Sequence, residues 1–455
     1  MSVEKSFQDL IDANKWNELD RFDRYARSDF DPPYLPSVNR NQIANEYRDL
    51  LERADLGICA LVVSAVVDRL QVYGFRNAVD ADIDETVWKW WQTSKLDARQ
   101  TLLYRDAMVF GSGFLSVTPG GNVPVYRPES PLNMVVKYDP TDPSLVMYAA
   151  KQVDDYGWFY DSEAIYGLRY DKTISSTRRW RIVSAIEHGA GATPIVRFAN
   201  RVDSRGRDLS EISLVEGPQR RIIQTIADRL MVQRSASWRQ RWISGIDIET
   251  DTDGNAVPPF RIGVDQLVVS ENPDARFGEW SESPFDTHLK AVEEDIRHAA
   301  AVSQTPPHLL TPTSISNISA DALVALEAGL TAKVTERQLQ WGESLEYAMR
   351  LGGQMVGYEV NDEAEVLWKD LERRSDAQRV DGVLKLRSMG LPMRYMLERL
   401  GLSPQAIDRV MTEYEAENQR AARAAAAAYG LGSDASMQAD SDLLNSAGGV
   451  DNAIK

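Results

Sequence analysis

The residues best suited to chemistry are few and widely spaced. His288, His298 and His308 are ten positions apart, so on a helix they would point in different directions and would not share a metal site. The chain has no G-x-x-x-x-G-K-[ST] segment to cradle phosphates, no H-E-x-x-H and no paired-cysteine motif. Cys59, the only cysteine, lies in the apolar segment ICALVV, which favours a core position over a nucleophile. The sequence therefore predicts no catalytic, cofactor-binding or metal site.

One acidic segment partly imitates a calcium loop. Glu249, Asp251, Asp253 and Gly254 stand at matching offsets, but the twelfth position is Phe260 rather than the bidentate glutamate that calcium needs. An Asp-Gly pair is also a turn signal between two strands. We expect a β-hairpin here, not a calcium site.

A helical segment concentrates positive charge in an acidic protein. Residues 217–241 carry six arginines and one acid, Asp228, a local charge of +5 in a chain of net charge −17. Three interpretations are open: a solvated helix face, ion pairs with the acidic run 293–295 on a neighbouring helix or subunit, or contacts with DNA phosphates. The arginines are Arg220, Arg221, Arg229, Arg234, Arg239 and Arg241.

A second segment lacks charge altogether. From His298 to Ala320, 23 successive residues include no Asp, Glu, Lys or Arg, although 26% of the chain is charged. Pro306, Pro307 and Pro312 must interrupt any helix there. One interpretation is a linker packed between domains. The other is a loop that faces a polyanion without gripping it, because Lys or Arg would bind phosphates through counterion release.

Two helices flank this uncharged break. Residues 284–303 read as one helix and residues 319–351 as a longer one. At about 1.5 Å per residue the longer helix would span roughly 50 Å, which suits a bridge between layers or subunits. Its predicted apolar face consists of Leu323, Leu326, Leu330 and Val334.

The remaining elements indicate an α+β fold. Short β-type segments separated by Gly, Pro, Asp and Asn fill residues 113–200, with helical blocks before and after them. The predicted helical regions are 4–27, 39–70, 84–110, 210–242 with a kink at Pro218, and several short helices within 370–428. An antiparallel sheet region inserted between helical blocks follows from this pattern.

Bulk properties exclude several classes of protein. At 455 residues the chain is long enough for two to four domains. Its acidic balance argues against a conventional nucleic-acid binder. One cysteine permits no intrachain disulfide and points to a reducing compartment. We predict neither a signal peptide nor a membrane span, because no apolar run is long enough.

Several segments that follow one another along the chain resemble the portal proteins of tailed bacteriophages, the head-to-tail connector family. The resemblance covers nearly the whole chain and depends on order and spacing, since no segment is catalytic. The segments are RLQVYGF at 69–75, RDAMVFGSGFLSV at 105–117, GRDLSEISLVEGPQRRIIQTIADRLMVQRSASWRQRWISG at 206–245, FGEWSESPFDTHLKAVEEDIRHAAAVSQTPPHLL at 277–310, NISADALVALEAGL at 317–330 and DLERRSDAQRVDGVLKL at 370–386.

The resemblance implies a ring-forming protomer with named regions. These are a wing of helices and antiparallel β-structure (1–209), two stem helices (210–243 and 284–303), a small β clip (244–283), a tunnel loop (304–318), a long helix returning to the wing (319–369), a helical crown (370–428) and a disordered tail (429–455). The clip residues singled out are Asp251, Asp253, Gly254 and Phe260, and the arginines above would form a basic stem face. The tunnel-loop residues facing DNA would be Gln304, Thr305, His308, Thr311, Thr313, Ser314, Ser316 and Asn317.

The resemblance also implies a function without catalysis or cofactors. A ring, usually of twelve subunits, would sit at one capsid vertex of the virion and pass double-stranded DNA during packaging and ejection without reading its sequence. It would assemble in the host bacterial cytoplasm. Expected partners are the terminase large subunit, a head-completion or adaptor protein, and the major capsid and scaffold proteins, with no membrane. Two alternatives stay open: a metal-dependent nuclease with a scattered acidic site, and another virion structural protein.

Overall fold

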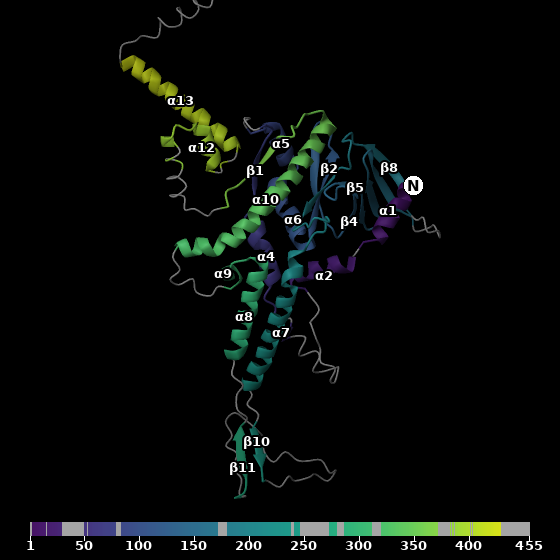
Figure 1. Cartoon of the computed structure of the whole chain (residues 1–455), viewed down its shortest axis with the longest axis vertical. Coiled ribbons are helices and arrows are strands. Elements are labelled where there is room, and N and C mark those ends of the chain that lie inside the picture. Colours follow the sequence, from purple (N-terminus) through teal and green to yellow (C-terminus); the bar gives the residue numbers. More distant parts are fainter. Residues whose placement is uncertain are drawn as a thin grey trace, which may run out of the picture. The chain divides into compact units, whose positions relative to one another are not determined.

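The computed structural model describes most of the chain as two compact units (Figure 1). The first unit comprises Met1–Leu70 and Ser94–Tyr358, and the second comprises Gln71–Thr93 and Glu359–Lys455. The grouping of residues 71–93 with the C-terminal part of the chain was not predicted. The described residues are 2–14, 16–29, 50–51, 53–78, 83–171, 180–237, 241–245, 273–279, 286–311, 320–371, 383, 385, 387–400, 402 and 404–428.

The first unit combines helices with antiparallel strands, as the sequence predicted. Its helices are α1 (Val3–Asp12), α2 (Trp16–Arg27), α4 (Ile58–Val67), α6 (Leu96–Phe110), α7 (Glu211–Ser237), α8 (Asp286–Ser303), α9 (Pro307–Leu310) and α10 (Ala320–Val356). Its strands are β2 (Ser112–Pro119), β3 (Pro124–Glu129), β4 (Met134–Tyr138), β5 (Val146–Val153), β6 (Tyr156–Tyr160), β7 (Ala164–Tyr170), β8 (Trp180–Glu187), β9 (Ile195–Ala199), β10 (Arg241–Ser244) and β11 (Arg276–Glu279).

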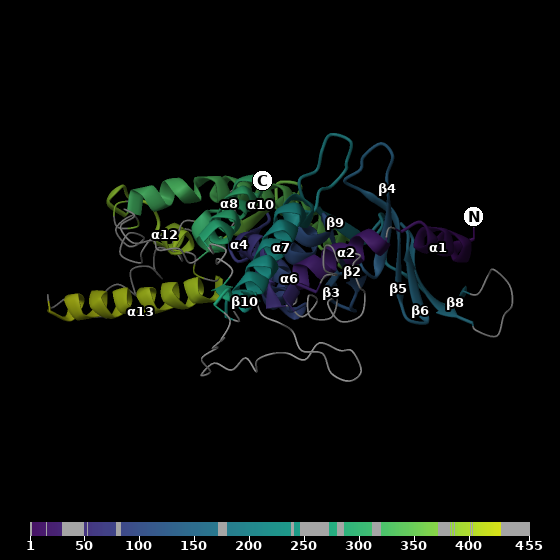
Figure 2. The ribbon, with the colours of Figure 1, turned by 90° about the horizontal axis from the view of Figure 1, so that it is seen from below.

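Two antiparallel sheets and one helix make up a layered core. The five-stranded sheet has the order β4-β5-β6-β7-β8, and the three-stranded sheet has the order β3-β2-β9. Helix α1 packs on one face of the larger sheet (Figure 2). The ring centroids of Phe7 and Trp180 are 4.8 Å apart in this contact. Phe114 of β2 and Ile195 of β9 pack on the opposite face. Side chains that alternate along each strand thus fill two different cores.

Helix α10 ties the smaller sheet to the helices. Trp341 is fully buried, stacks on Tyr104 of α6 with ring centroids 5.2 Å apart, and donates its indole N–H to the Ala199 carbonyl at 2.8 Å. The helix has 37 residues, longer than the 33 expected. The predicted apolar face is correct at Leu330 and Val334, which are buried, but wrong at Leu326, which is 47% exposed. Within the described part of α10, the buried positions begin at Leu330.

Helices α7 and α8 lie side by side and run in opposite directions (Figure 1). Helix α7 continues through Pro218, where one backbone hydrogen bond must be missing. The side chains of Ile222, Ile223 and Ala227 on α7 are buried, and so is that of Ile296 on α8. Strands β10 and β11 pair antiparallel in the segment between the two helices.

Three predicted helices are divided in the structure. The 39–70 region is interrupted at residues 54–57, before α4 begins at Ile58. The 4–27 region forms α1 and α2, which are separated by a break after Asp12. The 84–110 region is broken at Lys95, whose φ of +58° is left-handed and cannot continue an α-helix. Hydrophobic periodicity alone does not reveal a single reversed dihedral angle.

The second unit is small and partly helical. It contains β1 (Val72–Arg76), α5 (Glu85–Thr93), β12 (Glu365–Trp368), α12 (Met393–Arg399) and α13 (Pro404–Ala428). Strands β1 and β12 pair antiparallel, and Arg76 bridges to Glu398 at 2.6 Å. Ile407 of α13 is buried with Leu397 and Ile83, so α12 and α13 pack as a small cluster.

Candidate functional site

The α7–α8 pair contains the arginines that the sequence singled out. Arg221 contacts Asp295 of α8 at 2.8 Å, which agrees for this arginine with the second of the three interpretations, ion pairing with the acidic run. Arg220 donates to the Tyr25 hydroxyl at 3.0 Å and pairs with Glu216 at 2.9 Å. These two guanidinium groups are therefore occupied by partners within the chain.

The other predicted arginines are distributed differently. Arg229 lies half-buried on α7, Arg234 belongs to the last part of the same helix, and Arg241 begins β10. Arg239 lies outside the described residues. The six arginines thus do not share one uninterrupted helix face.

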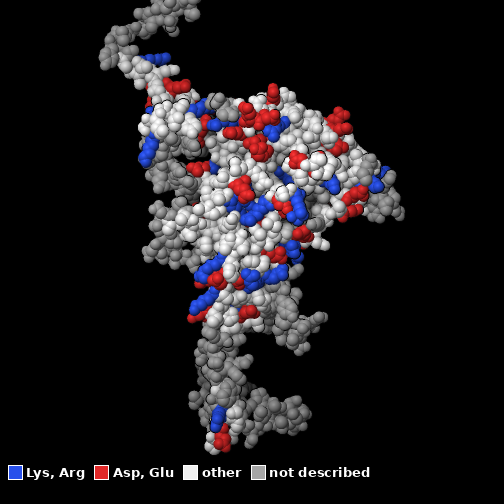
Figure 3. Space-filling view, viewed as in Figure 1, with Lys and Arg blue, Asp and Glu red and all other residues white. Residues whose placement is uncertain are grey.

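The acidic run is also partly neutralised on its own helix. Arg297 lies 2.9 Å from Glu294 and 3.6 Å from Glu293, whereas Asp295 contacts Arg221 of α7. On the face drawn in Figure 3, basic and acidic side chains lie beside one another over α7 and α8. On this face, the described part of the pair carries charges of both signs.

The end of α8 is formed by a Schellman motif. Gln304 has a left-handed φ of +53°, and its N–H donates to the Ala301 carbonyl at 3.3 Å. The Thr305 N–H donates to the Ala300 carbonyl at 3.0 Å. These two bonds satisfy carbonyl groups that a helix end leaves open and turn the chain sharply.

The predicted tunnel loop (304–318) is partly buried over its described residues. Of the predicted loop residues, Gln304 is exposed and Thr311 is half-buried, but Thr305 is only 2% exposed. His308 is largely buried and lies 3.5 Å from Glu327 of α10. Thr313, Ser314, Ser316 and Asn317 lie outside the described residues, as do the clip residues Asp251, Asp253, Gly254 and Phe260.

A buried charge cluster joins α7, α8 and α10. The Lys333 ammonium lies 2.7 Å from the Glu211 carboxylate, and both side chains are completely buried. Arg337 contacts the same carboxylate at 3.1 Å and Arg201 at 2.7 Å. Lys333 also donates to the Ser303 carbonyl at 2.9 Å. One carboxylate therefore holds three cations, two from α10 and one from the segment that follows β9.

Helix dipoles help to explain why this cluster is stable. Glu211 is in the first turn of α7, where the dipole is positive, and Lys333 meets the negative end of α8. Asn200 accepts hydrogen bonds from Arg337 at 2.9 and 3.1 Å. Burial lowers the pKa of Lys333 to about 8, although Glu211 opposes the shift. Burial raises the pKa of Glu211, but Lys333 and Arg201 outweigh it and the net shift is downward.

Sequence reasoning missed this cluster, although a signal existed. Buried positions along α10 recur as Leu330, Val334, Arg337 and Trp341, with Lys333 directly beside Val334. Two cations therefore occupy an otherwise apolar stripe. A charge at such a position needs a buried partner, and Glu211 is more than 100 residues away in the sequence.

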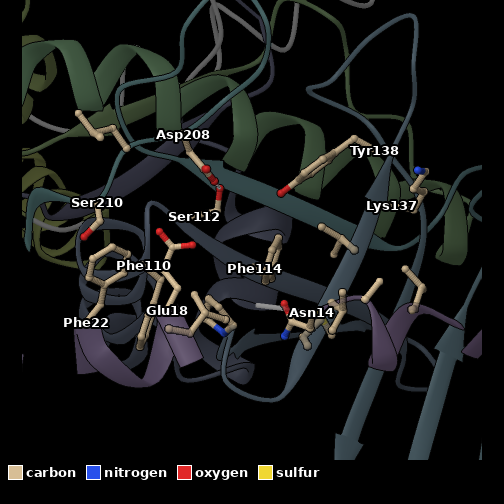
Figure 4. Close-up of a pocket in the computed structure, with 18 of the residues that line it drawn as sticks. Asn14, Glu18, Phe22, Phe110, Ser112, Phe114, Lys137, Tyr138, Asp208 and Ser210 are labelled. Carbon is tan, nitrogen blue, oxygen red and sulfur yellow. Dashed lines mark hydrogen bonds between the residues drawn. The ribbon is translucent and has the colours of Figure 1, made fainter. Parts of the chain in front are cut away.

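A second polar cluster borders a cavity of about 540 Å³ (Figure 4). Arg197 pairs with Asp208 at 3.0 Å, donates to the Ser112 hydroxyl at 2.9 Å and lies over the Tyr138 ring at 4.2 Å. Phe110 and other apolar side chains also line the cavity. The polar groups at its rim are largely engaged with one another, which gives the cavity no reactive pair.

Cys59 belongs to the core, and two histidines lie next to carboxylates, in the described residues. No group of three His, Cys, Asp or Glu side chains within them could hold a metal ion. Cys59 is fully buried and its thiol pKa is raised to about 12 by burial, which confirms the predicted core position. His298 lies near Glu294 and Asp295, whereas His308 lies near Glu327, so these two histidines are apart as expected. None of the described helices is long and apolar enough to cross a membrane.

Comparisons with known proteins give a consistent result. The family described as "Phage portal protein, SPP1 Gp6-like" matches residues 11–423. The chain is 27% identical over 385 residues to the portal protein of Mycobacterium phage L5, which covers 79% of this chain and 78% of that protein. It is 26% identical over 361 residues to the portal protein of Mycobacterium phage D29, covering 74% and 73%.

Solved structures give weaker similarities. A chain from the virion of a native gene transfer agent particle has a TM-score of 0.43 at 12% identity, covering 85% of this chain and 99% of that one. A chain from the neck of a native particle of the same kind has a TM-score of 0.41, also at 12% identity, covering 82% and 96%.

Proposed function

This chain belongs to the phage portal protein family of the SPP1 Gp6-like type, and we propose that it forms a ring around a channel for double-stranded DNA at one vertex of the capsid. Twelve subunits are the expected number. Residues 11–423 match the family, which includes both helices of the proposed stem. The chain is accordingly a structural component of the virion, and its assembly would take place in the bacterial cytoplasm.

The observation that carries this proposal is that two stem arginines, Arg220 and Arg221, contact partners within the chain. In a ring, each protomer would present its α7–α8 pair to the channel, and every free arginine would be repeated in every subunit. Free arginines would bind phosphates through counterion release and hold DNA in place. Arg220 and Arg221 instead contact Tyr25, Glu216 and Asp295. A wall with paired charges lets DNA slide in both directions.

We expect the ring to serve as a docking platform rather than as an enzyme. The clip at 244–283 would receive the terminase large subunit during packaging and a head-completion or adaptor protein afterwards. The wing and crown would meet the major capsid and scaffold proteins. ATP hydrolysis would belong to the terminase, in agreement with the missing phosphate-binding motif in this sequence.

Imaging and activity assays test this proposal directly. Negative-stain microscopy and mass photometry of the purified chain should show closed rings with a central channel, and DNA should pass without a sequence preference. Purified rings should hydrolyse no ATP and cut no DNA with Mg²⁺ or Mn²⁺. Isolated globular particles under all assembly conditions, or metal-dependent cleavage by the pure chain, would contradict it.

A further inference from the structure

Helix α10 holds the end of α8 from one side through Lys333. The ammonium group donates to the Ser303 carbonyl, the last residue of α8, and to the buried Glu211 carboxylate at the start of α7. The very next residue, Gln304, reverses the chain through its left-handed φ. Lys333 therefore joins the ends of two antiparallel helices at the point where the predicted tunnel loop (304–318) begins.

A second contact holds the same segment four residues later. The His308 imidazole lies 3.5 Å from the Glu327 carboxylate. Glu327 stands six residues before Lys333 on α10. Glu327 also lies 3.6 Å from Arg69, whose guanidinium donates to the Ala65 carbonyl of α4 at 2.8 Å. This contact connects α9 to α4 and α10.

Buried side chains in and just after this segment agree with a fixed position. Thr305 is 2% exposed and Leu310 is 4% exposed, and the Pro307 carbonyl accepts the Thr311 N–H at 3.0 Å. The short helix α9 packs against both α4 and α8. Moving the segment would leave a buried ammonium without one acceptor and would expose these side chains.

We propose that residues 303–310 form a fixed anchor, and that Lys333 and Glu327 are the positioning residues that hold it. Thr305 and His308 then belong to the anchor and do not contact DNA, although the sequence alone placed them among the DNA-facing residues. The inference extends the proposed function, because the anchor fixes where the expected tunnel loop leaves the protomer. A tie made by directional hydrogen bonds sets that position more narrowly than apolar packing would.

Cysteine labelling tests the anchor, because the only native cysteine is fully buried. Thr305→Cys places a thiol inside the anchor, and Gln304→Cys places one at the exposed neighbouring position. With a small maleimide, Thr305→Cys should react at least tenfold more slowly than Gln304→Cys. Adding Lys333→Met should raise the rate at position 305 at least fivefold and leave the rate at position 304 unchanged.

Cys59 reports whether Lys333→Met acts locally. A merely structural loss of stability would raise labelling at Cys59 and at position 305 together, whereas loss of positioning raises it at position 305 alone. Glu327→Gln should give a smaller increase of the same kind and serves if Lys333→Met does not fold. Lys290→Met, on the exposed side of α8, is the matched control and should change neither rate.

Three outcomes would overturn the anchor. The first is equal labelling at positions 304 and 305 in the parent chain. The second is an unchanged rate at position 305 in both Lys333→Met and Glu327→Gln. The third is an equal rise at Cys59 and position 305 in both. The measurement is made on unassembled protomers, so it is independent of ring formation, and failure to form rings leaves the anchor intact.

Discussion

Ion pairs of nearly equal length occur in two very different settings in this protein. Arg221 and Asp295 on the α7–α8 surface are 2.8 Å apart, and Lys333 and Glu211 in the buried cluster are 2.7 Å apart. The Arg221 side chain is 55% exposed, so water and salt weaken its attraction to Asp295. Both side chains of the buried pair are inaccessible. The surface pairs neutralise charges on α7 and α8. The buried cluster instead fixes how α7, α8 and α10 pack, because an unpaired charge is tolerated only at the surface.

Removing the shared carboxylate should have the largest effect. Glu211→Gln leaves three cations facing a neutral amide, and breaking a buried pair in this way costs about 3–5 kcal/mol. Urea denaturation of the unassembled protomer measures the loss. The matched control is Glu294→Gln, which removes an exposed carboxylate from α8 and should change stability by less than about 1 kcal/mol. Equal effects of the two variants would remove the distinction between the regions.

The buried cluster should also make stability depend on pH. The pKa of Lys333 is about 8 in the folded chain and 10.5 in its ordinary state. Between these values the unfolded chain keeps a proton that the folded chain has lost, so stability rises with pH. A shift of this size corresponds to about 3 kcal/mol. Denaturation at pH 7.5 and pH 10 should show this rise in the parent chain and a smaller one in Lys333→Met.

Asp106 sharpens the comparison, because the two arginines that act on it, Arg105 and Arg27, do not outweigh its burial. Burial and then Asp23 raise its pKa from 3.8 to about 7, the opposite direction to Glu211. The folded chain therefore holds a proton that the unfolded chain loses, and stability falls as pH rises from about 4 to about 7. Asp106→Asn should stabilise the protomer by about 1–2 kcal/mol at pH 8 and by little at pH 4. Thermal unfolding at both pH values measures this difference.

Breaking the surface pair should have the smallest effect. Arg221→Gln removes the contact with Asp295 and should lower stability by about 0.2–1 kcal/mol in low salt. The effect should shrink further in 1 M NaCl, because the screening length falls to about 3 Å. A loss that is insensitive to salt would indicate that this pair behaves like the buried cluster.

Local patterns in the sequence predicted the elements of the fold well. Alternating apolar residues and turn residues identified the antiparallel strands of 113–200, and the three long helices were found near their observed bounds. The arginine-rich helix and its acidic partner run were also recognised, and the contact between Arg221 and Asp295 agrees with one of the three interpretations. The errors came from single residues, such as the reversed dihedral angle at Lys95 that divides one predicted helix.

The candidate site was less predictable, because burial depends on distant parts of the chain. Thr305 and His308 belong to a segment without charge, and nothing nearby in the sequence distinguishes a loop facing solvent from one packed under a helix. Glu327 of α10 provides the contact for His308, and the adjoining helix α9 packs against α4 and α8. Lys333 carried no visible role either, since its partner lies on another helix.

Composition and periodicity by themselves determined an acidic α+β chain with a long helix, an arginine-rich helix and an uncharged break, because these properties depend only on residues close together in the sequence. Tertiary structure alone decided which charges are buried and which part of the break is held in place. The physical reason is that the energy of a charge depends on its surroundings, and Glu211, Lys333 and Ser303 become neighbours only when α7, α8 and α10 pack together.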